Sequence, residues 1–374
     1  MKNLFFYGSL RHVPLLEFVL GRGADQLDLS DAALADHAVL AAPGGVFPVL
    51  VPQAGAVAQG ILVRGLSEAD VARLRFYEGG FDYDLCQIKL ISGAQAEVFM
   101  PSPTVEVTEA AWALDRWVQD WGAMSLAAAD EVMAAYGVAS PEEIAARFPR
   151  IRARAWSRVL AKSGRHGQGV LDGRVEIVDR RRAHTNFFGL DEIQLRHETF
   201  DGGMSEVLDR AVFISSDAAV VLPYDPVRDR VLLVEQIRLG AVGRHDSVVW
   251  QMEPVAGLVD PGERPEDAAH REAFEEAGLR FVALEPVGEC YASPGSSTDF
   301  FHLYVGLCDL PDEAGGVGGE ESEGENIRSH LMSFEALLEL AEARKTANVP
   351  LTLLTYWLAH HRTRLRSGAQ SVVG

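Results

Sequence analysis

The chain has 374 residues, of which 34 are lysine or arginine and 54 are aspartate or glutamate, so its formal net charge is −20. This acidic balance argues against nucleic acid and membranes as partners, because both are polyanions that repel an acidic protein at long range. With 48% hydrophobic and 24% charged residues, the chain has the composition of a soluble globular protein, and its length predicts two domains.

Hydropathy and cysteine usage both favour a cytoplasmic location. The sequence contains no apolar run of about 18 residues, which a transmembrane helix would need. The apolar run at the N-terminus, MKNLFFYGSL, is too short for a secretory signal. Cys86, Cys290 and Cys308 are far apart and lack histidines at ligand spacing, so we expect neither disulfides nor a zinc site.

The first hundred residues predict short strands with one helix. Segments rich in β-branched or aromatic residues, bounded by Gly, Pro or Asp, favour strands. They lie at residues 4–6, 38–40, 57–63, 86–91 and 97–100. A helix is predicted over residues 68–76, because Ser67 stands in the N-cap position.

The next segment is predicted to be helical and to end in a linker. From residue 108 to about 162, apolar residues such as Ala111, Leu114 and Trp117 recur at spacings of three, and an alanine-rich run follows. Residues 163–169, SGRHGQG, combine three glycines with polar residues and no periodicity, which is typical of a linker. We therefore expect boundaries near residues 105 and 170, giving segments 1–105, 106–170 and 171–374.

The second half mixes strands with helices. Strands are predicted at residues 175–178, 193–198, 211–214, 218–222, 231–236 and 301–306, and helices at 265–277, 334–344 and 351–365. This mixture indicates an α/β or α+β fold. By composition alone, the acidic and glycine-rich stretch 309–325 is predicted to be a solvated loop.

One predicted helix carries an unusual set of carboxylates. It begins at Pro265, which suits a first helical position, and stops at Gly278. Glu272, Glu275 and Glu276 share one face, where each like-charged pair costs a few tenths of a kcal/mol. For three glutamates alone a solvated acidic helix is the simpler interpretation, but hard cations such as Mg²⁺ take this kind of oxygen ligand.

The full pattern around this helix resembles a known motif. Its fixed positions are Gly257, Glu263, Arg271, Glu272, Glu275, Glu276 and Gly278. This is similar to the Nudix box, whose family hydrolyses nucleoside diphosphates linked to another moiety. The resemblance implies Mg²⁺, with Mn²⁺ as an alternative, bound by Glu272 and Glu276 with catalytic support from Glu275. It implies that Glu263 and Arg271 orient the loop and the helix.

The flanking residues resemble the ADP-ribose pyrophosphatase branch of this family. The similar segments are residues 186–257 and Ser293-Pro294-Gly295, whose proline lies sixteen residues after Gly278. The resemblance implies hydrolysis of ADP-ribose to AMP and ribose 5-phosphate. Two alternatives remain open: another nucleoside diphosphate sugar such as GDP-mannose, and a sensor that binds ADP-ribose without cleaving it.

Individual residues of this branch carry expected roles. Arg238 would meet the ligand phosphates, and Glu253 would lie near the metal and the ligand. Ala256 would offer its main-chain carbonyl to a metal. Phe187 or Phe188 would stack on adenine from a strand exchanged between subunits, which implies a homodimer, although core packing explains this pair equally well.

The end of the acidic stretch resembles the catalytic loop of the same branch. Glu323-Gly324-Glu325-Asn326-Ile327 places Glu323 as the general base and Glu325 as a metal ligand, with Asn326 departing from the acid of that pattern. Glu320 and Glu321 are rivals for the base. Glycines flank these carboxylates, so we expect a loop that closes over the substrate.

The first domain carries a different signal. The turn Tyr7-Gly8-Ser9-Leu10 follows a strand and can present backbone N–H groups to a carboxylate or oxyanion. Together with residues 59–63, Tyr77-Glu78-Gly79 and Tyr83, it resembles a gamma-glutamylcyclotransferase-like domain. This implies a cavity with Glu78 as the acid/base for cyclising a gamma-glutamyl amine. Arg75 replaces an aspartate common in relatives, so a domain that only binds a ligand remains the alternative.

The two resemblances together imply an α+β protein of two domains. The first is a small gamma-glutamylcyclotransferase-like β-barrel with helices, and the second is a Nudix α/β/α sandwich with a mixed sheet. The expected partner is a small nucleoside diphosphate sugar, and the homodimer is expected to form through the second domain.

Overall fold

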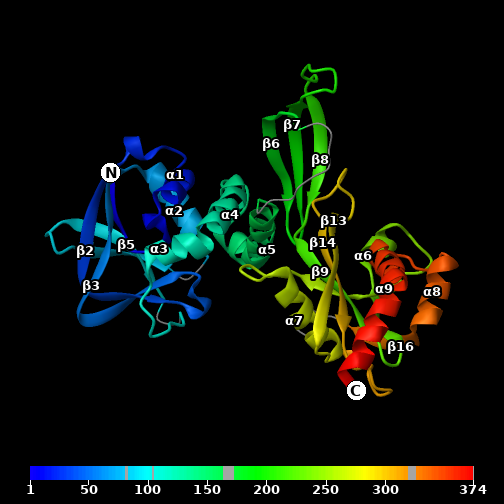
Figure 1. The fold of residues 1–374 in the computed structure, drawn as a ribbon. Helices are drawn as coiled ribbons and strands as arrows, with labels where there is room; N and C mark the ends of the chain where they lie inside the picture. Colours follow the sequence, from blue (N-terminus) through cyan, green and yellow to red (C-terminus); the bar gives the residue numbers. More distant parts are fainter. Residues whose placement is uncertain (81–82, 103–104, 163–171, 319–325, 374) are drawn as a thin grey trace. The chain divides into compact units, whose positions relative to one another are not determined.

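The computed structural model describes residues 1–374 except 81–82, 103–104, 163–171, 319–325 and 374 (Figure 1). The chain forms two compact units, Met1–Phe213 and Ile214–Gly374. The expected α+β organisation in two domains is confirmed, while the boundaries near residues 105 and 170 stay predictions. None of the helices in the described ranges combines the length and hydropathy needed to cross a membrane.

The first unit is built on a mixed five-stranded sheet. Its strands are β1 (Lys2–Phe6), β2 (Asp28–Ala41), β3 (Pro48–Leu66), β4 (Tyr83–Lys89) and β5 (Gln95–Pro101). They lie in the order β2-β3-β1-β5-β4, with β1 antiparallel to β3 and parallel to β5. Within the described residues no ladder joins β2 to β4, so hydrogen bonds do not close this sheet into a ring.

Helices cover this sheet and supply most of its core. They are α1 (Val13–Leu20), α2 (Glu68–Glu78), α3 (Leu114–Trp117), α4 (Ala123–Ala134) and α5 (Pro141–Ala161), with a short π-helical turn at Val118–Gly122. Helix α2 starts as predicted, because Ser67 and Asp70 form a reciprocal capping box. The buried cluster draws on α1 through Leu15 and on α5 through Ile151.

The structure corrects one predicted helix. Residues 108–112 are not helical and are bonded to the end of β2, where the Thr108 and Trp112 N–H groups donate to the carbonyls of Ala41 and Val39. The helical spacing of Ala111 and Leu114 is therefore coincidental, and the helix begins only at Leu114. Hydrogen bonds to the distant strand β2 decide the conformation here, rather than the local spacing of apolar residues.

A separate three-stranded sheet ends the first unit. It consists of β6 (Val175–Thr185), β7 (Gly189–His197) and β8 (Leu208–Ile214) in that order. Much of β6 is exposed, including the apolar side chains of Val175, Ile177 and Val178. Strand β6 therefore buries little of its surface within the chain.

The second unit is a sandwich around a mixed sheet. Its strands are β9 (Asp217–Asp225), β10 (Arg230–Ile237), β11 (Trp250–Glu253), β12 (Val255–Leu258), β13 (Ala283–Tyr291), β14 (Phe300–Leu307), β15 (Val317–Gly318) and β16 (Ile327–Ser333). The main path is β13-β14-β9-β10-β16-β15, with β12 beside β9 and β11 beside β10. The pair β9 and β14 is parallel, whereas β12 runs antiparallel to β9.

Helices cover both faces of this sheet, as the expected α/β/α sandwich requires (Figure 1). They are α6 (Leu239–Gly243), α7 (Pro265–Ala277), α8 (Phe334–Glu342) and α9 (Val349–Val373). On β9, Val220 and Leu222 pack against Phe334 of α8 and Leu354 of α9. The alternate residue Ala219 is paired with Gly257 of β12, and that face carries α7.

Candidate active sites

Helix α7 has the bounds that its sequence predicted. Arg264 is the extended N-cap residue, Pro265 takes the first helical position, and Gly278 closes the helix with φ of 65° in the left-handed region. Proline lacks the N–H that would be unbonded there, and glycine adopts a positive φ without steric cost. The ends of the carboxylate helix are therefore fixed by local chemistry.

Arg271 is the centre of the charge network on α7. Its Nε and Nη2 donate to the two carboxylate oxygens of Glu263 at 3.1 and 3.0 Å, and Nη2 also donates to the Leu258 carbonyl at 3.0 Å. Nη1 donates to Glu272 at 2.6 Å and to Glu275 at 3.0 Å. The structure thus brings Glu263 and Arg271 together as expected, joining the loop before α7 to the helix.

Glu272 lies directly against the backbone of β12. A Cβ atom built on Gly257 would be 1.9 Å from the Glu272 carboxyl carbon, so any other residue at position 257 would displace this carboxylate. The neighbouring Ala256 is the residue expected to offer its carbonyl to a metal. Gly257 therefore serves a close approach between a helix carboxylate and a strand backbone.

Glu276 is buried on α7, with 4% of its surface exposed. A buried carboxylate is costly unless a cation or hydrogen bonds offset its desolvation. Glu272, Glu276 and the Ala256 carbonyl all offer hard oxygen atoms, the kind of donor that a divalent cation takes. Within the described residues, no three His, Cys, Asp or Glu side chains are placed to hold a metal by themselves.

The loop that was expected to complete this set lies outside the described residues. Glu323 and Glu325, and the rivals Glu320 and Glu321, all belong to residues 319–325. Their roles as base and metal ligand stay predictions.

Arg238 and Glu253 are brought together at the edge of the same sheet. Arg238 follows β10 and Glu253 ends β11, and the guanidinium donates through Nε and Nη2 to both carboxylate oxygens at 2.6 to 2.9 Å. Glu253 is buried, while the Arg238 side chain is 43% exposed. The buried carboxylate therefore fixes the orientation of the guanidinium, whose planar fork is of the kind that suits both carboxylate and phosphate.

Phe187 and Phe188 lie in the first unit, on the turn between β6 and β7. The two residues are 47% and 39% exposed, so both lie at the surface rather than in the buried core. The two rings meet edge to face with centroids 4.7 Å apart, and Phe188 also contacts Phe213 on β8. The guanidinium of Arg150 on α5 lies 4.2 Å from the centroid of the Phe187 ring.

A buried ion network, which the sequence did not indicate, holds this turn to the helices. Arg154 on α5 is 1% exposed and donates to Glu131 on α4 at 2.5 Å and to the Phe187 carbonyl at 2.6 Å. Glu131 also forms an ion pair with Arg182 on β6, and Arg182 in turn pairs with the buried Asp191 on β7. Burial raises the pKa of Glu131, but Arg154 and Arg182 outweigh it and hold the pKa below its usual range.

The residues expected from the first domain converge on one small cavity. It has a volume of about 70 Å³ and is lined by the Tyr7-Gly8-Ser9-Leu10 turn together with Phe5, Phe6, Phe47, Pro48, Glu78, Tyr83 and Phe99. Glu78 is the last residue of α2, and the turn follows β1. The cavity therefore places a carboxyl group beside a turn whose backbone N–H groups can bind an anion.

Burial shifts the pKa values of titratable side chains that line the cavity. Burial raises the pKa of Glu78 from near 4.5 to about 7. Burial, with the neighbouring Tyr83 and Glu78, also raises the pKa of Tyr7, whose hydroxyl donates to the Phe99 carbonyl at 3.1 Å. A carboxyl that titrates near neutrality can both accept and return a proton, which is what an acid/base residue needs.

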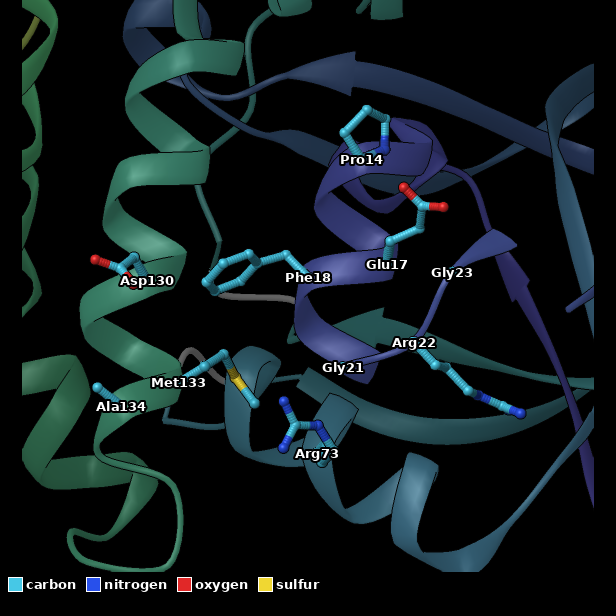
Figure 2. Close-up of a pocket in the computed structure, with 10 residues that line it drawn as sticks. All are labelled: Pro14, Glu17, Phe18, Gly21, Arg22, Gly23, Arg73, Asp130, Met133 and Ala134. Atoms are coloured by element: carbon cyan, nitrogen blue, oxygen red, sulfur yellow. The ribbon is translucent and has the colours of Figure 1, made fainter. Parts of the chain in front are cut away.

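A larger hollow in the first unit is less suited to catalysis. It has a volume of about 670 Å³ and is bordered by α1, α4 and Arg73 of α2 (Figure 2). Its charged groups are engaged within the protein, since Arg22 pairs with Asp70 at 2.8 Å and Arg73 donates to the Val19 carbonyl at 2.7 Å. Asp130 pairs with two arginines in the same way.

Comparisons with known proteins match both halves of the chain. The NUDIX domain family matches residues 215–353, and the family described as gamma-glutamyl cyclotransferase, AIG2-like, matches residues 4–118. The ADP-ribose pyrophosphatase of Escherichia coli (strain K12) is 40% identical over 193 residues, covering 52% of this chain and 91% of that protein. The chain therefore belongs to the Nudix family, and its second half is a Nudix pyrophosphohydrolase.

Two further relatives bear on the substrate. The ADP-ribose pyrophosphatase of Haemophilus influenzae is 35% identical over 194 residues, covering 51% of this chain and 89% of that protein. The GDP-mannose pyrophosphatase of Cronobacter sakazakii is also 35% identical, but over 167 residues, covering 44% of this chain and 84% of that protein. The similarity to the two ADP-ribose pyrophosphatases thus extends over more residues than the similarity to the GDP-mannose pyrophosphatase.

Proposed function

We propose that the Nudix half hydrolyses ADP-ribose to AMP and ribose 5-phosphate with the help of Mg²⁺. The observation that carries this proposal is the α7 arrangement, in which Arg271 fixes Glu272 against Gly257 and Glu276 is buried beside it on the helix. The longer similarity to relatives named ADP-ribose pyrophosphatase supports this substrate over GDP-mannose.

Different residues of the second unit take different roles in the proposed hydrolysis. Glu272 and Glu276, with the Ala256 carbonyl, would hold the cation, while Glu263 and Arg271 keep α7 against the preceding loop. A divalent ion bound there supplies positive charge to a diphosphate and acidity to a water molecule. Arg238, oriented by Glu253, binds the anionic substrate, and Glu275 supports the carboxylate set. In this proposal Glu323 is the general base and Glu325 is a further metal ligand.

Product analysis tests the substrate. The purified protein with Mg²⁺ is expected to convert ADP-ribose into AMP and ribose 5-phosphate, as followed by chromatography, and to act more slowly on GDP-mannose. A preference for GDP-mannose would replace the proposed substrate. Binding of ADP-ribose without any turnover would instead favour the sensor.

We also propose that the protein is a cytoplasmic homodimer formed through the predicted Nudix segment 171–374, which includes β6. The exposed apolar side chains on β6, such as Val175 and Ile177, support a second copy as the cover of this sheet. Stacking of Phe187 or Phe188 on adenine stays a prediction, for which their exposed rings are suited. Sedimentation analysis is expected to give twice the mass of the chain.

For the first unit we propose a gamma-glutamylcyclotransferase-type reaction. The pKa of Glu78, near 7, favours this activity over a domain that only binds a ligand. Glu78 takes a proton from the α-amino group of the gamma-glutamyl compound, and the amine nitrogen attacks the γ-carbonyl carbon. The C–N bond to the leaving amine breaks, Glu78 returns the proton to that amine, and 5-oxoproline is released.

Release of 5-oxoproline tests this second activity. A panel of gamma-glutamyl amines is expected to yield 5-oxoproline with the wild type and none with Glu78→Gln. A wild type that binds such compounds without releasing 5-oxoproline would leave the first unit as a binding domain.

A further inference from the structure

The mouth of the Glu78 cavity is formed in part by a short rim segment, residues 46–48. Phe47 and Pro48 of this segment line the cavity, and Phe47 is 44% exposed. The rim segment links the turn Pro43–Gly45 to β3, and the Ala42 N–H donates to the Phe47 carbonyl at 3.0 Å. A loop in this position needs a further anchor to keep a fixed shape.

Trp117 supplies that anchor from a distant part of the sequence. Its indole Nε1 donates to the Val46 carbonyl at 2.6 Å, across 71 residues of chain. Trp117 is itself 4% exposed and packs against the rings of Trp112 and His12. The bonds of residues 108–112 to the end of β2 fix the chain that leads into α3.

The rim segment packs directly against the Gly8-Ser9 turn. A Cβ atom built on Gly8 would lie 2.5 Å from Cγ of Pro48, so the proline ring occupies the space that a side chain at position 8 would need. Movement of the rim segment is therefore transmitted to the Gly8-Ser9 turn, since no gap separates the two.

Helix α5 supports the same cavity from behind Glu78. Cβ atoms built on Gly79 and Gly80 would lie 2.9 Å from Cβ and 2.6 Å from the carbonyl oxygen of Pro141, which opens α5. The Glu78-Gly79-Gly80 corner is thus packed against the helices that follow the sheet. Both sides of the cavity depend on the chain after residue 107.

We infer that Trp117 is a positioning residue for the Glu78 cavity. Through the Val46 carbonyl it fixes the rim segment, and through Pro48 it fixes the backbone of the Gly8-Ser9 turn that receives the ligand. The identity of the ligand in this inference rests on the proposed function of the first unit. The fixing of the rim segment and of the turn by Trp117 does not depend on that function.

The rim segment that Trp117 positions also bears on which substrates the cavity admits. The ring of Phe47 lines the cavity and is 44% exposed, so the cavity meets solvent beside this ring. We expect the amine portion of a gamma-glutamyl compound bound at Glu78 to pass beside this exposed ring. The Trp117 anchor thus sets how wide a substrate the mouth admits.

A matched pair of tryptophan variants tests the inference. Trp117→Phe keeps an aromatic ring and removes the N–H, whereas Trp112→Phe removes an indole N–H that has no acceptor within the described part of the chain. Hydrogen exchange of the full-length protein is followed at residues 44–50 and 5–11, and binding of 5-oxoproline is measured by calorimetry.

We expect Trp117→Phe to speed exchange in both segments and to weaken 5-oxoproline binding, each by about fivefold, the effect of one net hydrogen bond. Trp112→Phe should change neither. Equal effects of the two variants, or faster exchange at the rim without any change at residues 5–11, would overturn the inference. Thermal melting of both variants checks that they fold.

Pro48→Ala separates the two steps of the proposed coupling. It keeps the Trp117 bond but removes the ring that presses on Gly8, so exchange should rise at residues 5–11 and stay unchanged at Val46 and Phe47. A wild type that does not bind 5-oxoproline would defeat the proposed function of the first unit. The exchange measurements would still decide whether Trp117 positions the cavity.

Discussion

Helix α7 and the Glu78 cavity both present carboxyl groups, but they surround them differently. On α7, Arg271 donates to Glu263, Glu272 and Glu275, and although burial lowers the Arg271 pKa, Glu263 and Glu272 raise it well above its usual range. In the cavity, burial raises the pKa of Glu78 to about 7. The first setting pairs its carboxylates with a guanidinium, and the second prepares one carboxyl group for proton transfer.

Glu131 shows that burial alone does not decide between these settings. It is 3% exposed, yet its pKa is lowered, because Arg154 and Arg182 outweigh the desolvation. The neighbouring guanidinium groups make the difference between a charged and a protonatable carboxyl group.

The largest expected effect comes from Glu276→Gln. Loss of one buried carboxylate from the cation site should lower the hydrolysis of ADP-ribose about a thousandfold, since a bound ion contributes several kcal/mol to the transition state. Rates with Mg²⁺ are compared with those of the wild type, with circular dichroism as the folding control. Near-normal turnover would show that α7 is not the catalytic helix.

Arg154→Met tests the role of the guanidinium in the Glu131 network. Removing one partner of a buried pair should cost about 3–5 kcal/mol in the free energy of unfolding, as measured by urea denaturation of the first unit. Arg158→Met is the control, because its pair with Asp130 is partly exposed and should contribute at most about 1 kcal/mol. Equal losses in the two variants would contradict the assigned importance of the buried network.

Glu78→Gln gives the smallest and most pH-dependent change. The folded pKa of about 7 lies above the ordinary 4.5, so between these values the folded state binds more protons than the unfolded state. The stability of the wild type relative to Glu78→Gln should therefore fall as the pH rises from about 4.5 to about 7, and then level off. Melting curves across this range check the sign, and a constant difference would contradict the raised pKa.

Sequence predicted the parts of these sites that local chemistry fixes. The bounds of α7 follow from Pro265 and Gly278, and the start of α2 follows from Ser67, because each acts within one helical turn. The Nudix spacing also placed Glu263 and Arg271 in one network, which the structure shows.

Contacts between distant segments could not be predicted in this way. The ion pair of Glu131 with Arg154 joins two helices, and nothing in the alanine-rich pattern of α4 marks its partner. The non-helical conformation near Thr108 depends on its bonds to Ala41, and the bond from Trp117 to Val46 joins residues 71 positions apart in the sequence. Such pairings depend on the tertiary fold rather than on local periodicity.

The most direct test of the whole account is a calorimetric titration with Mg²⁺, in the presence and absence of ADP-ribose. We expect the wild type and Glu78→Gln to bind the ion, and Glu272→Gln and Glu276→Gln to lose most of this binding. Absence of Mg²⁺ binding by the wild type under both conditions would contradict the claim that the α7 carboxylates form a cation site.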